Sequence, residues 1–272
     1  MKKVVLIGGG NMASALLGGW KKKSLINDAW VIEPREDQRR WLIDHHKVHA
    51  VAQASDAPLN EADFWVLAVK PQMALTALLQ LPKPRADLPV ISVMAGVRLE
   101  TLQAHLSDHP LWIRAMPNTP ALVQAGITGL YATPNVPLAV RQATESLFRA
   151  VGRVIWCDTE SQLDGVTALS GSGPGFVFYM MEAFLEAARE LELPANVVDD
   201  LVKGTFAGAI ALAQHSDEAP GLLRARVTSP GGTTEAGIRT LDSAQVSEHI
   251  QAAILKAAHR ARQIGDDFSR AT

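Results

Sequence analysis

The sequence is short of the features that define several other classes of protein. Its 272 residues include a single cysteine, Cys157. That count excludes an internal disulfide and a cysteine-rich metal site, and it is typical of a reducing compartment. The 26 basic and 28 acidic residues are interspersed and give a net charge of −2. We therefore expect no nucleic-acid partner.

Long apolar runs are also absent. The longest uncharged stretch, residues 165–181, is interrupted by Ser, Gly and Pro, so it is a poor candidate for a membrane span. The apolar run at residues 4–7 is too short for the core of a signal peptide. We expect a cytoplasmic protein with no membrane partner.

The sequence of residues 1–160 alternates short β-branched or aromatic runs with longer helix-like segments. This alternation predicts an α/β Rossmann domain with a mostly parallel sheet. Several of the short runs are apolar throughout, as is typical of strands covered on both faces. The predicted strands are residues 4–7, 30–32, 48–51, 65–69, 90–93, 112–115, 127–131 and 154–157, and helices at 12–22, 37–45 and 138–150 lie between some of them.

The second part, residues 161–272, predicts an all-α domain, with helices at 176–191, 195–214, 234–241 and 244–264. The first of these helices is apolar on most sides rather than along one stripe, so it needs cover all round. A domain of this size has difficulty supplying that cover, and we expect the helix to pair with a second copy of the chain. Residues 266–272 are polar and are expected to fray.

A glycine-rich loop follows the first predicted strand directly. Residues 8–13 read GGGNMA, which matches G-x-G-x-x-G/A between a strand and a helix, the context of a dinucleotide-binding loop. Gly8 permits the tight turn, Gly10 lets the backbone approach a pyrophosphate, and Ala13 keeps the helix close to the sheet. The helix N-terminus then offers N–H groups and partial positive charge to the anion.

Two residues after the second strand give opposite indications about the cofactor. Glu33, at the strand end, is suited to both ribose hydroxyls and repels a 2′-phosphate, which favours NADH. Arg35 is suited to pairing with that phosphate, which favours NADPH. An alternative is that both residues only cap the helix that begins near Asp37. The preference between NADPH and NADH therefore stays open.

Further motifs extend over the rest of the chain. They are AVKPQ at 68–72, AGV at 95–97, RAMPNTP at 114–120, LSGSGP at 169–174, PGL at 220–222 and TSPGGTT at 228–234. In order and spacing the chain resembles pyrroline-5-carboxylate reductases from the first strand to the last helix. It departs from them at residues 223–225, where LRA replaces a common Leu-Lys-Asp, and at Glu33, because many members prefer NADPH.

This resemblance implies an enzyme that reduces L-1-pyrroline-5-carboxylate to L-proline, the last step of proline biosynthesis, with NADPH or NADH. It implies a helical dimerisation domain, a homodimer with a shared active site, and further assembly into a decamer. The 229–234 loop would bind the substrate carboxylate and face the nicotinamide held by the partner chain. Two glycines beside a helix start, with nearby hydroxyls, are suited to such an anion nest.

The same resemblance assigns individual residues. Thr234 is the expected catalytic residue, hydrogen-bonded to the ring nitrogen. The expected substrate-binding residues are Ser229, Gly231, Gly232, Thr233 and Thr234, with Glu160 and Asp217 at positions that contact the product in some members. The expected cofactor-binding residues are Gly8, Gly9, Gly10, Asn11, Met12, Glu33, Arg35, Ser55, Ala68, Val69, Lys70, Pro71, Ala95, Asn118 and Thr119. No metal ligand is predicted.

Other classes fit the sequence less well. A β-hydroxyacid dehydrogenase would need a lysine as acid and base early in the second domain, and the nearest candidate, Lys203, lies in a polar setting suggestive of a solvated helix face. A non-catalytic redox sensor would need the glycine loop at residues 8–13 but not the loop at 229–234. A hydrolase is disfavoured because LSGSG at 169–173 lacks the first glycine of a nucleophile elbow.

Overall fold

The computed structural model describes residues 2–106 and 109–271. The chain forms two compact units, one of Met1–Ser172 with Lys256–Thr272 and one of Gly173–Leu255. The division that the sequence predicts at residue 160 stays a prediction.

The first unit is built on one eight-stranded sheet. Its strands are β1 Lys2–Ile7, β2 Ile26–Ile32, β3 His49–Val51, β4 Phe64–Leu67, β5 Val90–Ser92, β6 Trp112–Met116, β7 Gly126–Ala132 and β8 Gly152–Trp156. The strand order is β3-β2-β1-β4-β5-β6-β7-β8, and every pair is parallel except β6 with β7. The first six strands have the order 3-2-1-4-5-6 of a Rossmann fold, whose ligand crevice lies where the order reverses, between β1 and β4. The predicted mostly parallel sheet is therefore confirmed.

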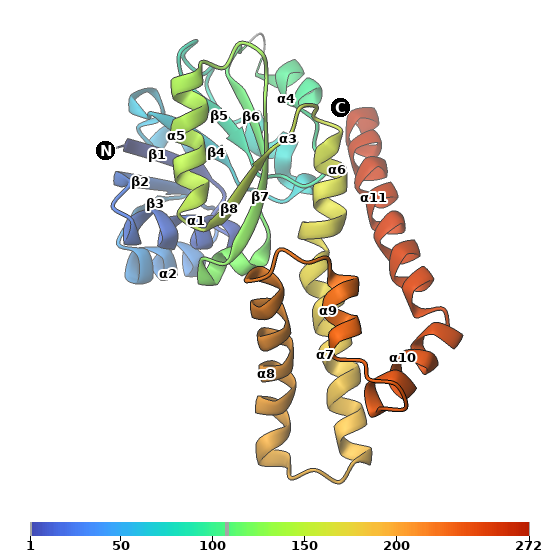
Figure 1. Cartoon of the computed structure of the whole chain (residues 1–272). Coiled ribbons are helices and arrows are strands. Elements are labelled where there is room, and N and C mark those ends of the chain that lie inside the picture. Colours follow the sequence, from blue (N-terminus) through green and yellow to red (C-terminus); the bar gives the residue numbers. More distant parts are fainter. Residues whose placement is uncertain (1, 107–108, 272) are drawn as a thin grey trace. The chain divides into compact units, whose positions relative to one another are not determined.

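Helices cover both faces of this sheet (Figure 1). One face packs against α1 Asn11–Lys22, α2 Glu36–His46 and α5 Leu138–Arg149. The other packs against α3 Ala74–Leu78 and α4 Leu99–His105, with Phe268 from the last helix. Four 3-10 turns, Ala54–Asp56, Leu59–Glu61, Pro71–Met73 and Thr119–Val123, connect these elements.

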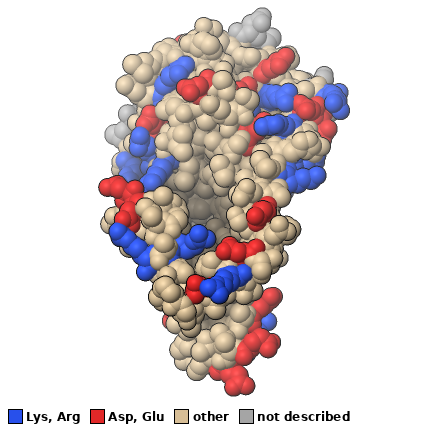
Figure 2. All heavy atoms as spheres, turned by 45° about the vertical axis from the view of Figure 1, so that its right-hand side comes forward, with Lys and Arg blue, Asp and Glu red and all other residues tan. Residues whose placement is uncertain are grey.

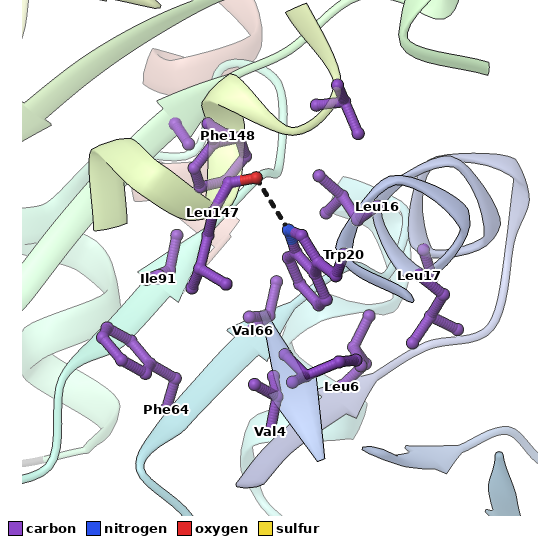
Figure 3. Close-up of a cluster of buried hydrophobic side chains, with 14 of the residues drawn as sticks. Val4, Leu6, Leu16, Leu17, Trp20, Phe64, Val66, Ile91, Leu147 and Phe148 are labelled. Carbon is purple, nitrogen blue, oxygen red and sulfur yellow. Dashed lines mark hydrogen bonds between the residues drawn. The ribbon is translucent and has the colours of Figure 1, made fainter. Parts of the chain in front are cut away.

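Apolar side chains fill the space between the sheet and α1. Trp20, which is fully buried, lies among residues of β1, β4 and α5 (Figure 3). Its indole N–H donates to the backbone oxygen of Leu147 over 2.9 Å, so the one polar atom of this ring is paired. Burial of such large side chains supplies about 1.5–3 kcal/mol each. This packing holds α1, and the loop before it, in a fixed place on the sheet.

The remaining helices are α6 Gln162–Val166, a π-helical turn Thr167–Gly171, α7 Gly173–Glu190, α8 Ala195–Gln214, α9 Pro220–Arg226, α10 Thr233–Ser243 and α11 Val246–Ala271. The prediction that residues 266–272 fray is wrong through Ala271, because α11 continues to that residue. Asp266 accepts a hydrogen bond from Arg98 over 2.6 Å, and the hydroxyls of Ser269 and Thr101 lie 2.9 Å apart. Thr272 lies outside the described residues.

The second unit has little core of its own. Among its described apolar residues only Ala188 and Val202 are buried, whereas Phe178 is 58% exposed and Ile210 is also 58% exposed. Figure 2 shows basic and acidic side chains interspersed on the face in view, with acidic ones at the end of the α7–α8 hairpin. No helix within residues 2–106 and 109–271 is long and apolar enough to cross a membrane. A single copy of the chain thus leaves the α7 face without the cover that its sequence requires.

Candidate dinucleotide and substrate sites

The glycine loop between β1 and α1 has the geometry of an anion cradle. Gly8 adopts φ +102°, and a Cβ there would lie 2.7 Å from the carbonyl oxygen of Ala68, so the turn requires glycine. A Cβ on Gly10 would have no atom of the described chain within 4 Å. None of the described side chains caps α1, whose first turn contains no acid. Its first N–H groups therefore remain available to an anion in the space beside Gly10.

A cleft of about 540 Å³ opens beside this loop. It lies at the carboxyl ends of β1, β2 and β4, where ligands of open α/β sheets bind. Eight of the fifteen predicted cofactor residues line it: Gly8, Gly9, Gly10, Glu33, Arg35, Ala68, Val69 and Lys70. Ser55 lines a second hollow that shares Pro34 and Gln80 with the cleft. The residues present fit a dinucleotide, with a glycine cradle at one end of the cleft and apolar walls along it.

Glu33 and Arg35 form one hydrogen-bonded group at the end of β2. One carboxylate oxygen of Glu33 accepts the backbone N–H of Gly9 over 3.1 Å. The other accepts the backbone N–H and the Nε–H of Arg35, over 3.1 and 3.0 Å. The Glu33 carboxylate is buried and accepts these three hydrogen bonds, whereas the Arg35 side chain is 60% exposed. Its terminal guanidinium nitrogens hydrogen-bond to no other described residue.

The other predicted cofactor residues lie outside the lining of this cleft. Asn11 and Met12 form the first turn of α1, Pro71 begins a 3-10 turn, and Ala95 and Thr119 follow β5 and β6. Asn118 is buried, and its side-chain amide donates to the backbone oxygen of Ser170 and accepts from the N–H of Ile127. That amide is therefore committed to holding the backbone. The predicted cofactor contacts of these six residues stay predictions.

The sequence reasoning missed some residues that line the cleft and others that hydrogen-bond to its lining. Gln38 donates to the backbone oxygen of Gly9 over 2.6 Å, and Arg39 donates to the carbonyl of Glu33 over 2.9 Å. Both lie in the first turn of α2, a few residues after Glu33, and this closeness in the sequence could have indicated that they contact the same region. Thr76 and Gln80 line the cleft from α3 and the turn after it, and that short helix had no recognisable periodicity.

The 229–234 loop of the second unit leads into α10. Gly231 adopts φ +72°, and the N–H of Gly232 donates to the carbonyl of Ser229 over 3.0 Å, which closes a tight turn. The hydroxyls of Ser229, Thr233 and Thr234 hydrogen-bond to no other described residue, and all three residues are exposed. The N–H of Gly231 differs, because it already donates to Glu235 over 2.7 Å. The loop thus presents hydroxyls and a helix N-terminus together.

Glu160 and Asp217 have different surroundings. Glu160 accepts hydrogen bonds from buried Arg114 over 3.0 Å and from the N–H of Leu99, at the start of α4, over 2.8 Å. These contacts give it a structural role within the first unit. Asp217 is exposed in the segment before α9. Their contacts with a substrate stay predictions.

Lys203, the lysine that a hydroxyacid dehydrogenase would need, lies in a surface ion pair. Its Nζ lies 2.6 Å from Asp199, and both side chains are about three-fifths exposed. Hydrogen bonding to Asp199 raises the pKa of Lys203 from its ordinary value. A proton-shuttling lysine needs a lowered pKa, so this geometry argues against that class.

The fold and the glycine cradle define a Rossmann-type dinucleotide-binding oxidoreductase architecture. Comparison with protein families agrees at both ends of the chain. Residues 3–96 match the family described as NADP oxidoreductase coenzyme F420-dependent, and residues 160–264 match pyrroline-5-carboxylate reductase dimerisation.

Similar proteins extend over nearly the whole chain. A pyrroline-5-carboxylate reductase of Pseudomonas aeruginosa is 36% identical over 270 residues, with 97% of this chain and 98% of that protein covered. The solved structure of a pyrroline-5-carboxylate reductase from Coxiella burnetii is 35% identical, covers 97% of this chain and 98% of its own, and has a TM-score of 0.84. A Plasmodium falciparum pyrroline carboxylate reductase, solved with NADP bound, shares the fold at 24% identity and a TM-score of 0.87, with 97% and 98% covered. The chain belongs to the pyrroline-5-carboxylate reductase family.

Proposed function

We propose that this protein reduces L-1-pyrroline-5-carboxylate to L-proline with a reduced nicotinamide dinucleotide, as the last step of proline biosynthesis. The observation that carries the proposal is that one chain combines an open glycine cradle at Gly10 with a glycine- and threonine-rich loop at the start of α10. A dinucleotide sensor would need the first feature only. The names of the relatives support the same substrate.

The cofactor is proposed to bind in the cleft beside the glycine loop, with its pyrophosphate at Gly10 and the start of α1. When bound, it supplies a hydride equivalent. Glu33 has three donors on its carboxylate already, whereas the guanidinium of Arg35 extends into solvent at the cleft. A 2′-phosphate is a dianionic acceptor for such a guanidinium. We therefore propose NADPH as the preferred cofactor and NADH as the weaker one.

The substrate carboxylate is proposed to bind at the 229–234 loop. Ser229 and Thr233 would supply hydroxyl donors, and the left-handed φ of Gly231 with the Gly232-to-Ser229 hydrogen bond makes the tight turn between them. Thr234 is the catalytic residue in this proposal: its hydroxyl, which has no partner in the described chain, would hydrogen-bond the ring nitrogen of the substrate. An iminium nitrogen arrives already protonated, so the protein needs no general acid for that step. Its contribution is positioning, which removes much of the entropic barrier.

The active site is proposed to be shared between two chains. The apolar α7 face is exposed in one copy, and the dimerisation family model covers α7 through most of α11. A homodimer would cover this face and bring the 229–234 loop of one chain to the cofactor of the other. Further assembly of dimers into a decamer, and action in the cytoplasm, are part of the same proposal.

Turnover by the purified protein tests the proposal. With L-1-pyrroline-5-carboxylate we expect oxidation of NADPH, and more slowly of NADH, with one proline formed for each cofactor consumed. Tight NADPH binding without turnover of this substrate would favour the sensor class and contradict the proposal.

A further inference from the structure

The 229–234 loop is held by a carboxylate from its own helix. Glu235 Oε2 accepts the backbone N–H of Gly231 over 2.7 Å, and Oε1 accepts a hydrogen bond from Arg239 over 3.0 Å. Glu235 and Arg239 are one helical turn apart on α10, so they share a face. The Glu235 side chain is 29% exposed, compared with 75% for Arg239. The acid therefore lies toward the loop, and the arginine lies outside it.

This contact closes the loop at its glycine pair. Gly231 has the left-handed φ of +72°, and its N–H lies just before the helix, where no intrahelical partner exists. Glu235 is the third residue of α10, the position from which an acid reaches back to a donor at the helix start. Together with the Gly232-to-Ser229 hydrogen bond, it fixes the backbone on both sides of Gly231. The hydroxyls and the N–H groups of Thr233 and Thr234 stay unpaired within the described chain.

The negative charge of Glu235 lies beside the proposed site of the substrate carboxylate. A carboxylate beside a loop that receives a second carboxylate would repel it, and it would compete for the same donors. Here the ion pair with Arg239 compensates the charge of Glu235, and the acid takes only the N–H of Gly231, which precedes the helix. The helix N-terminus and the loop hydroxyls are left for the ligand. Glu235 therefore holds the loop backbone without occupying the donors that the substrate carboxylate would use.

We propose that Glu235, held by Arg239, is a positioning residue for recognition of the substrate carboxylate. It keeps Gly231 in the conformation that presents the donors of the loop, and so favours cyclic imines that carry a carboxylate over those that do not. This inference rests on the proposed function and deepens it.

The test compares two substrates that differ only in the carboxylate, namely L-1-pyrroline-5-carboxylate and 1-pyrroline. Glu235→Ala should raise KM for the carboxylated substrate about tenfold, equivalent to about 1.4 kcal/mol, with kcat changed less than about twofold. Catalytic efficiency with 1-pyrroline and the Kd of NADPH should not change. Glu235→Gln should restore most of the affinity, because its amide oxygen can accept the Gly231 N–H. Glu248→Ala, an exposed acid in the first turn of α11, is the matched control and should behave as wild type.

Arg239→Ala provides a second variant if Glu235→Ala does not fold. It exposes the charge of Glu235 and should raise KM for the carboxylated substrate severalfold, with less effect at high salt because screening weakens the repulsion. An unchanged or lowered KM in either variant would overturn the inference, as would equal losses with both substrates. Inactivity of the wild-type protein toward both imines would instead refute the proposed function, and the inference with it.

Discussion

Replacement of Gly10 by valine separates cofactor binding from folding. The backbone of Gly10 is extended, with φ −75° and ψ −170°, which valine adopts without strain. A Cβ there meets no described atom within 4 Å, so the folded protein should tolerate the side chain. A pyrophosphate seated against this backbone would not. Loss of one hydrogen bond to a charged group costs about 1.5–3 kcal/mol, and the Kd for NADPH should therefore rise about 10- to 150-fold for each bond lost.

Calorimetric titration with NADPH measures this effect, and thermal unfolding shows whether the variant is folded. Gly9→Ala is the comparison variant for stability: unlike a side chain at Gly10, its Cβ would lie 2.6 Å from Leu42 Cδ1 and 3.1 Å from Glu33 Cβ. Overpacking of this kind costs about 1–3 kcal/mol of stability, so this variant should unfold at lower temperature. A folded Gly10→Val protein that binds NADPH as tightly as wild type would refute the placement of the pyrophosphate.

Three further predictions concern the cofactor, the shared site and pH. Arg35→Ala should weaken the binding of NADPH by about 1.5–3 kcal/mol and leave the binding of NADH nearly unchanged. Arg39→Ala, which removes hydrogen bonds to two backbone carbonyls, should affect the binding of both cofactors equally. Equal losses of binding for both cofactors in Arg35→Ala would contradict the phosphate assignment. Thr234→Ala should lower kcat/KM about 10²-fold with unchanged NADPH affinity. Mixing the Thr234→Ala and Gly10→Val proteins under conditions that exchange subunits should recover part of the activity. No recovery despite verified exchange would show that each site lies within one chain. Burial, then the nearby charges of His45 and Lys21, lower the pKa of His46, which lies 2.7 Å from Ser14. The unfolded chain therefore binds a proton at this histidine first as pH falls below about 6.5. The free energy of unfolding should decrease on acidification below that pH, and it should decrease less steeply in His46→Gln. Identical pH profiles of the two proteins would exclude His46 as a contributor.

Local patterns in the sequence predicted most of the first unit. All eight predicted strands are present, and the glycine loop lies where its context indicated. The central strands β1, β4, β5 and β6 are mostly buried, which is why they read as apolar runs. The antiparallel pairing of β7 with β6 was not predicted, since pairing depends on residues distant in the sequence. The helices α3, α4 and α9, of five to seven residues, complete too few turns for an amphipathic period to be visible.

Tertiary contacts explain the differences that remain. The end of α11 is polar and reads as a frayed tail, but Asp266 pairs with Arg98, and Phe268 packs on the sheet core. The amide of Asn118 hydrogen-bonds to the backbone of the π-helical turn and of β7, contacts that its sequence motif did not indicate, and its predicted contact with the cofactor stays a prediction. The hydrogen bond between Glu235 and Gly231 follows a helix-capping pattern that was present in the sequence. Its acceptor reaches the N–H of Gly231 because that residue has a left-handed φ, which the sequence does not specify.

Transfer of deuterium from cofactor to product tests the central claim most directly. The protein is incubated with L-1-pyrroline-5-carboxylate and NADPH that carries deuterium at either face of nicotinamide C4, and the proline is analysed by mass spectrometry. We predict proline with one deuterium on the ring carbon that was the imine carbon, from one of the two labelled faces and not from the other. Proline without label from either cofactor, or no proline at all, would contradict the assignment.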